Sequence, residues 1–153
     1  MSNIITQAWE EMIKPILFRP KRVQVAALCF RTTKIGKEVL LITSRGTGRW
    51  ILPKGWPITG MDGAESALQE AWEEAGVTKA ALLGADPLGS YDYVKLETGK
   101  PQVEIQTLVY AAEVAELKDE YPEASQRKRQ WMKPAEAANL VNEPELQELL
   151  RQF

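Results

Sequence analysis

The apolar residues of this chain recur with two periods, and each period predicts a different kind of element. Stretches rich in apolar and β-branched residues, bounded by Gly, Pro or polar clusters, predict strands. These stretches cover residues 23–31, 38–44, 49–53, 103–114 and 126–132, and polar and apolar residues also alternate in parts of 82–94. Within 103–114 the alternation is clear enough to assign faces, with Ile105 on one face and Glu104 on the other.

Helical spacing of apolar residues occurs in four further segments. It predicts an amphipathic helix over 3–17, in a lead-in segment 1–20, and helices over 64–75, from Pro134 onward and over 143–152. Gly76 directly follows the second of these and is expected to cap its C-terminus. Strands, one helix, strands and then helices predict an α/β fold in which helices cover a mixed sheet, with the loop 54–63 as the mouth of a site.

The helix over 64–75 carries three carboxylates at helical spacing. Glu70, Glu73 and Glu74 occupy positions i, i+3 and i+4, so they share one face. Three like charges on one face repel each other, and a bound divalent cation would reverse that balance. Magnesium prefers hard oxygen ligands, commonly one or two carboxylates together with substrate phosphates and water. The pattern therefore predicts a metal site for a phosphate substrate, in which Glu70 and Glu74 could bridge two cations.

Composition narrows the function classes. The chain has 153 residues, the size of one domain, and its net charge of −2 argues against a nucleic-acid partner. It contains no histidine, which excludes histidine catalysis and histidine-ligated zinc. The single cysteine, Cys29, lies in an apolar run and allows no internal disulfide, as expected for a cytoplasmic protein. No apolar run reaches the ~18 residues of a membrane span, so no membrane partner is expected.

The segment from Gly55 to Val77 resembles the Nudix box, G-x5-E-x7-R-E-U-x-E-E-x-G-U, where U is a bulky apolar residue. The matching positions are Gly55, Glu70, Glu73, Glu74, Gly76 and Val77, with Ala71 as a small substitute for U. Two positions depart, because Met61 stands where the box has its first glutamate and Gln69 where it has arginine. Residues 39–45 and 49–55 are similar to the strand and loop that lead into a Nudix box, and residues 27–31 and 127–132 are similar to the diphosphoinositol polyphosphate phosphohydrolase subfamily.

This resemblance implies an α/β/α Nudix sandwich, formed as a single domain over 21–153, and hydrolysis of a phosphoanhydride with Mg²⁺ or Mn²⁺. It implies metal ligation by Glu70, Glu73, Glu74 and the Gly55 carbonyl. Asp62 or Glu65 could partly replace the carboxylate lost at position 61. Gln69 can donate a hydrogen bond but cannot neutralise its neighbours. The general base is open between Glu73, Glu104 and a water relay. Glu104 would have to reach across from its strand, and its position favours an exposed strand residue over a catalytic one.

Basic residues gather around the predicted mouth and suggest a rim that binds phosphate. Lys54 is the strongest single candidate because it precedes Gly55. The resemblance implies that Ser44, Arg45 and one of the residues 127–129 hold substrate phosphates. The candidate substrate-binding residues are Arg22, Ser44, Arg45, Lys54, Arg127, Lys128 and Arg129. Each of the charged residues could instead be ordinary surface charge, and Trp56 could contact a ligand from the loop.

Three functions remain open at this point. The leading hypothesis is a metal-dependent pyrophosphohydrolase acting on an inositol pyrophosphate or a diadenosine polyphosphate. Met61 and Gln69 motivate the second, a weakly active or inactive Nudix module that binds a nucleotide or polyphosphate as a sensor. The third is hydrolysis of the 5′ pyrophosphate of RNA or of pool nucleotides, against which the low net charge argues. The helix over 3–17 makes a homodimer plausible.

Overall fold

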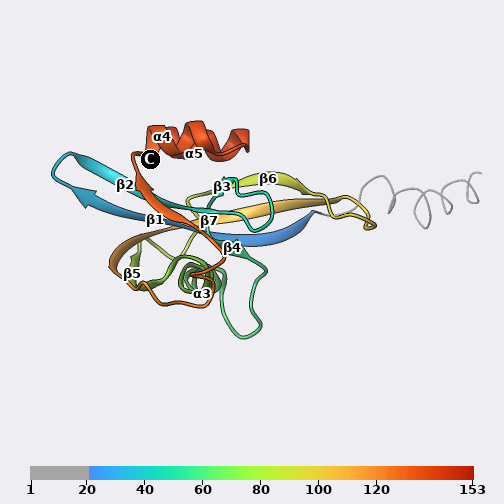
Figure 1. Cartoon of the computed structure of the whole chain (residues 1–153), viewed down its shortest axis with the longest axis horizontal. Coiled ribbons are helices and arrows are strands. Elements are labelled where there is room, and N and C mark those ends of the chain that lie inside the picture. The colour runs from blue at the N-terminus through green and yellow to red at the C-terminus, as the bar shows by residue number, and fades with distance from the viewer. Residues whose placement is uncertain (1–20) are drawn as a thin grey trace, which may run out of the picture.

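One mixed sheet organises the protein, whose computed structural model describes residues 21–153 (Figure 1). Its strands are β1 (Arg22–Thr33), β2 (Gly36–Thr43), β3 (Trp50–Ile51), β4 (Lys54–Gly55), β5 (Val77–Leu82), β6 (Gly89–Lys95), β7 (Val103–Leu117) and β8 (Arg129–Met132). The main path runs β3-β2-β1-β7-β5, with β4 paired to β1, β6 to β7 and β8 to β2. Only β1 and β7 pair in parallel among these described strands, which makes the sheet mixed.

Helices cover both faces of the sheet. Helix α3 (Gly63–Ala75) lies on one face, and α4 (Pro134–Leu140) and α5 (Pro144–Gln152) lie on the other (Figure 1). Strand β1 is buried on both faces, and its side chains alternate between two cores. Leu28 packs in the core with α4 and α5, whereas Cys29 packs in the core with α3. The predicted α/β/α sandwich with a mixed sheet is therefore confirmed.

Local signals explain the limits of α3. Asp62 is the N-cap, and its carboxylate accepts a hydrogen bond from the Glu65 backbone N–H at 2.7 Å, while Glu65 Oε1 accepts from the Asp62 N–H at 3.3 Å. This capping box satisfies amide groups that the helix leaves without partners. Asp62 and Glu65, considered above as substitutes for the missing first glutamate, thus lie at the exposed start of the helix.

The sequence pattern missed or misplaced three short elements. Strand β5 has small and exposed residues and an irregular register near Lys79, so its alternation is weak. Strand β4 lies within the predicted loop and forms only through pairing with β1. Strand β8 begins at Arg129 and not near residue 126, because the Gln126 N–H donates to the Glu123 carbonyl at 3.0 Å and closes a turn there. The predicted helix over 3–17 lies outside the described residues.

Gly76 is a position where a side chain should be costly. Its φ of 76° is left-handed, and an added Cβ would lie 2.5 Å from the Lys118 carbonyl oxygen. Left-handed backbone costs a non-glycine residue about 1–2 kcal/mol, and the close contact adds to that. We expect Gly76→Ala to lower the free energy of unfolding by about 2 kcal/mol or more. Urea denaturation measures it, with Gly46→Ala, at a positive φ but in open space, as the comparison.

Among residues 21–153, no helix combines the length and the apolar character needed to cross a membrane.

Candidate active site

A pocket of about 580 Å³, called here the carboxylate pocket, opens where α3 passes the end of β4. Segments far apart in the chain build its wall: β1, the turn after β2, β4 and the residue after it, α3, the end of β6 and the segment before β8. The lining residues are Gln24, Ser44, Arg45, Ile51, Lys54, Gly55, Trp56, Glu70, Glu74, Lys95, Glu97, Glu123 and Arg127. Four carboxylates and four cationic side chains therefore face one space.

Glu74 is the most tightly held carboxylate of this pocket. Its Oε1 accepts a hydrogen bond from the Lys54 backbone N–H at 3.1 Å, and its Oε2 lies 3.3 Å from Arg127 Nη2. The side chains of Glu74 and Arg127 are each only 7% exposed. Burial raises the pKa of Glu74, and the Arg127 charge and the Lys54 N–H oppose that rise. Glu74 is therefore a buried carboxylate, held in one orientation, that can bind a cation.

Arg127 connects three parts of the pocket. Besides Glu74, its guanidinium donates to the Thr43 carbonyl at 3.2 Å and to Glu123 Oε1 at 3.1 Å. Buried arginine with several acceptors holds a fixed orientation. The guanidinium thus holds two of the pocket carboxylates and the end of β2 in place.

Glu70 lies one helical turn before Glu74 and is partly exposed to the pocket. Burial, followed by the nearby carboxylates Glu74, Glu73 and Glu123, raises the pKa of Glu70 to about 7. The Gly55 backbone passes close to this carboxyl, since an added Cβ would lie 2.4 Å from Glu70 Cδ. A side chain at position 55 would push the Glu70 carboxyl away, so glycine lets the backbone and this carboxyl approach each other beside the pocket.

Lys54 is the cation with the most perturbed surroundings. Its Nζ donates to Tyr93 Oη at 2.9 Å and to Gln24 Oε1 at 3.4 Å. Burial lowers the pKa of Lys54 to about 8, while the Glu74 charge acts in the opposite direction. The ammonium therefore remains charged at neutral pH and starts to lose its proton in mildly alkaline solution.

The donor set fits a divalent cation, although it is not a complete cage. Among residues 21–153, no three acidic or cysteine side chains already surround a common point. Magnesium, however, usually takes only one or two carboxylates and fills its remaining positions with water and phosphate oxygens. Glu70 and Glu74, next to the Gly55 backbone, supply that kind of ligand set. Burial and the neighbouring carboxylates raise the pKa of Glu70, and a bound cation would favour its ionised form.

The titration of Glu70 yields a prediction about pH and metal. Its folded pKa of about 7 exceeds the usual 4.5, so between these values the folded state keeps a proton that the unfolded state has released. Stability from this group is therefore present at low pH and is lost as pH rises through about 7. We expect Mg²⁺ to raise Tm more at about pH 8 than at about pH 5.5, and Glu70→Gln to abolish the difference. Equal Mg²⁺ shifts at both pH values in the parent protein would contradict this.

Several predicted site residues meet in the carboxylate pocket. They are Ser44, Arg45, Lys54, Gly55, Glu70, Glu74 and Arg127. Ser44 Oγ accepts from the Arg49 N–H at 3.1 Å, which fixes the turn after β2, and Arg45 lies 3.5 Å from Glu123 Oε1. The loop and the helix thus both contribute residues to the wall of this pocket.

Other candidates lie elsewhere. Glu73 is half-buried on α3 and does not line the pocket, and Glu104 lines a separate shallow hollow beside Lys21. Arg129 donates to the Ala75 and Lys118 carbonyls at 2.8 and 2.7 Å, near the C-terminal end of α3. Lys128 is exposed and uses its backbone N–H to reach Thr43 Oγ1. Arg22 lines a neighbouring hollow, described below.

Sequence reasoning missed four polar lining residues: Gln24, Lys95, Glu97 and Glu123. Glu123 lies four residues before Arg127, and that spacing of opposite charges was the one signal available for it. Gln24 is a polar residue inside an apolar strand, which is also a usable signal because buried polar groups need partners. The sequence holds no signal that Lys95 and Glu97 face the pocket, since charged residues near a hairpin are usually solvated.

The α/β/α sandwich brings Glu70 and the buried Glu74 together with cationic side chains in one pocket, an arrangement suited to a phosphate compound. A model of the NUDIX domain family matches residues 20–153, so the chain belongs to that family. The predicted family and enzyme class, a Nudix hydrolase acting on pyrophosphate bonds, are therefore confirmed. Nudix hydrolases generally need divalent metal ions.

Individual relatives agree with this assignment. The chain is 30% identical to human diphosphoinositol polyphosphate phosphohydrolase 3-alpha over 120 residues, which are 77% of this chain and 68% of that protein. The crystal structure of the C. elegans Ap4A hydrolase superposes with a TM-score of 0.61 at 20% identity, covering 88% of this chain and 96% of that one. The NUDIX domain of Shewanella oneidensis NrtR, complexed with ADP ribose, superposes with a TM-score of 0.57 at 19% identity and 96% coverage of both chains.

Proposed function

We propose that this protein is a metal-dependent pyrophosphohydrolase that cleaves a phosphoanhydride in a phosphate-rich small molecule. The observation that carries the proposal is the Glu70–Glu74 pair, which lines one pocket together with Arg45 and Lys54. Inositol pyrophosphates and diadenosine polyphosphates are the substrates suggested by the names of similar proteins. The cationic wall suits either of them.

Glu70, Glu74 and the Gly55 carbonyl are the groups proposed to hold Mg²⁺ or Mn²⁺. A bound divalent ion neutralises phosphate oxygens and lowers the pKa of a coordinated water. Arg127 and the Lys54 N–H hold the Glu74 carboxylate in one orientation, so that it need not reorient when the metal ion binds. Arg45, Ser44 and the Lys54 ammonium, which line the same pocket, are the groups proposed to bind phosphate oxygens.

Proton transfer has several candidates in this proposal. Glu70 has a pKa of about 7, which suits exchange of a proton near neutral pH. Glu123 also faces the pocket, whereas Glu73 and Glu104 would have to act through water or after movement.

Placing the protein in the cytoplasm agrees with its lone, buried thiol. The homodimer stays a prediction that rests on the undescribed segment.

A metal-dependent substrate screen tests the function. Purified protein with Mg²⁺ or Mn²⁺ should release phosphate from an inositol pyrophosphate, or nucleotide from a diadenosine polyphosphate, and chelation should stop the release. A triphosphorylated RNA and free nucleoside triphosphates belong in the same panel, since they represent the third hypothesis. Turnover of RNA alone would replace the proposed substrate class, and no turnover of any member would overturn the proposal of an active enzyme.

A second candidate is a sensor that binds without efficient turnover. Met61 is 40% exposed at the start of α3 and provides no carboxylate there, and Gln69 brings no charge to the helix. A NUDIX domain complexed with ADP ribose shares this fold. Calorimetry decides between the two: tight binding of a polyphosphate or ADP ribose at millimolar metal, without product formation, would favour the sensor.

A further inference from the structure

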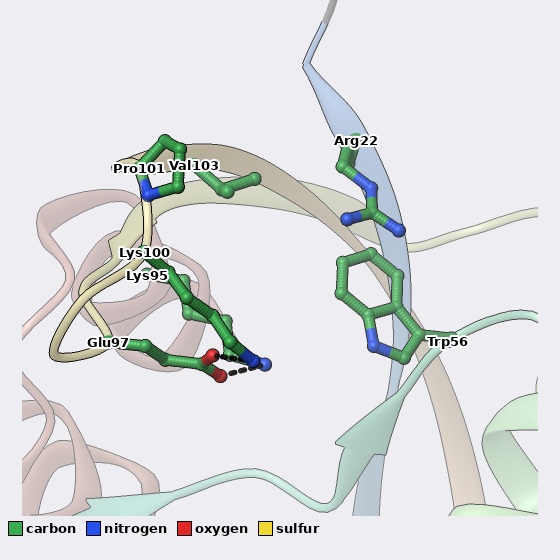
Figure 2. A pocket seen from close by; sticks show the side chains of 7 residues that line it. All are labelled: Arg22, Trp56, Lys95, Glu97, Lys100, Pro101 and Val103. Atoms are coloured by element: carbon green, nitrogen blue, oxygen red, sulfur yellow. Dashed lines mark ion pairs between the residues drawn. The ribbon is translucent and has the colours of Figure 1, made fainter.

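A second hollow of about 380 Å³, called here the side pocket, lies next to the carboxylate pocket. Arg22 and Trp56 form one wall and Lys95, Glu97 and Lys100 form the facing wall (Figure 2). The two pockets share Trp56, Lys95 and Glu97, so one ligand can extend from the carboxylates into the side pocket. The side pocket is therefore a continuation of the proposed active site.

The charge of the side pocket favours an anion. It has three cationic side chains and a single carboxylate. That carboxylate, Glu97, lies between two of the cations, with Oε1 3.1 Å from Lys95 Nζ and Oε2 2.9 Å from Lys100 Nζ (Figure 2). Both of its oxygens are therefore engaged, as the oxygens of a bound phosphate would be.

Trp56 also interacts with cations. The Arg22 guanidinium carbon lies 4.4 Å from the centroid of the Trp56 ring, and Lys95 Nζ lies 5.7 Å from it. Stacking uses the face of a guanidinium, whereas phosphate is bound through its edge, so the two contacts are compatible. A nucleobase that stacked on the same ring face would have to displace Arg22. This wall is thus better suited to a phosphate than to a base.

We propose that the side pocket is a second anion subsite, which binds a phosphate group of the substrate away from the bond that is cleaved. In the protein without ligand, the Glu97 carboxylate takes the place of that phosphate between Lys95 and Lys100. The ligand class is a small molecule with several separated phosphates. The word substrate rests on the function proposed above, but the existence of an anion subsite does not.

Binding of inositol hexakisphosphate to the full chain, measured by calorimetry in chelator without metal, tests the subsite. This probe has several phosphates and no phosphoanhydride, and without metal the carboxylate pocket, with as many carboxylates as cations, has no excess of positive charge to hold it. The double variant Lys95→Gln/Lys100→Gln should weaken binding about tenfold, because charge-assisted contacts are lost at a partly exposed site. Glu97→Gln should strengthen binding about threefold, because the competing carboxylate is gone.

Two control variants separate the subsite from general charge effects. Lys34 is an exposed lysine in the turn of the β1–β2 hairpin. This turn lies at the opposite end of the sheet from the loop between β6 and β7 (Figure 1). Glu38 pairs with Arg31 at 2.8 Å on the same hairpin. Lys34→Gln and Glu38→Gln should bind the probe as the parent protein does. The subsite is overturned if the lysine variant binds with parent affinity, or if Glu97→Gln fails to tighten binding more than Glu38→Gln.

Failure of this inference and failure of the proposed function give different results. If the lysines are not a subsite, the probe affinity is unchanged while Mg²⁺-dependent turnover persists. If the protein is no hydrolase, turnover is absent while the opposite responses of the lysine and Glu97 variants remain.

Discussion

Replacing Glu74 with Gln should reduce metal-dependent turnover by a factor on the order of 10³ or more. The side chain is buried, its two oxygens are oriented by Lys54 N–H and Arg127, and it lies one turn after Glu70 on the wall of the pocket. The amide keeps the shape but loses the negative charge that a divalent cation needs. Turnover of an inositol pyrophosphate at saturating Mg²⁺ measures the loss.

The fold of the Glu74 variant should survive, because the amide oxygen can still accept a hydrogen bond. Near-unchanged circular dichroism and a cooperative thermal transition would show this. Glu113→Gln is the matched control, since it removes an exposed glutamate from β7 outside the carboxylate pocket. A Glu74 variant that keeps more than a small fraction of parent turnover would disprove the proposed metal site.

The second large effect is expected at Arg127. Arg127→Met removes the cation that contacts both Glu74 and Glu123. It leaves the buried Glu74 without its ion-pair partner and Glu123 with only the exposed Arg45. Breaking a buried ion pair from one side commonly costs about 3–5 kcal/mol. We expect the free energy of unfolding to fall by about 3 kcal/mol and turnover to fall on the order of 10²-fold. Urea denaturation and steady-state kinetics measure the two losses.

The pH profile distinguishes positioning by Arg127 from a purely structural role. The Arg127 charge opposes the burial that raises the pKa of Glu74, so removing that charge should raise this pKa further. The acid limb of the kcat/KM profile should therefore move to higher pH in Arg127→Met, and it should return most of the way in Arg127→Lys, which keeps the charge. Lower activity with an unmoved acid limb would show that Arg127 only stabilises the fold.

The two departures from the Nudix box, Met61 and Gln69, can be compared with the charged residues that surround α3. Gln69 brings no charge to α3, whereas Arg127 reaches the last glutamate of the helix from a segment just before β8. Met61 provides no carboxylate, whereas Glu123 enters the pocket from that same segment. Charge absent from the helix is thus present around it, contributed by residues far away in sequence.

The sequence by itself determined the elements whose signals are local. The apolar run of β1 and the alternation in β7 predict strands, and the spacing of Glu70 and Glu74 predicts one helical face because side chains four apart must align. Gly76 predicts the end of the helix, because few other residues tolerate the left-handed φ of this C-cap position. These features depend on neighbours within a few residues, so they can be recognised without a fold.

Only the tertiary structure decided which charged residues face the pocket. Arg127, Lys128 and Arg129 are adjacent and chemically alike, yet Arg127 is buried against Glu74, Lys128 is exposed and Arg129 binds the end of α3. Side chains alternate along an extended segment, so a shift of one residue changes the surface that each one meets. Where a cation points therefore depends on strand register and on the packing of distant segments, and a pattern of neighbouring residues does not contain that information.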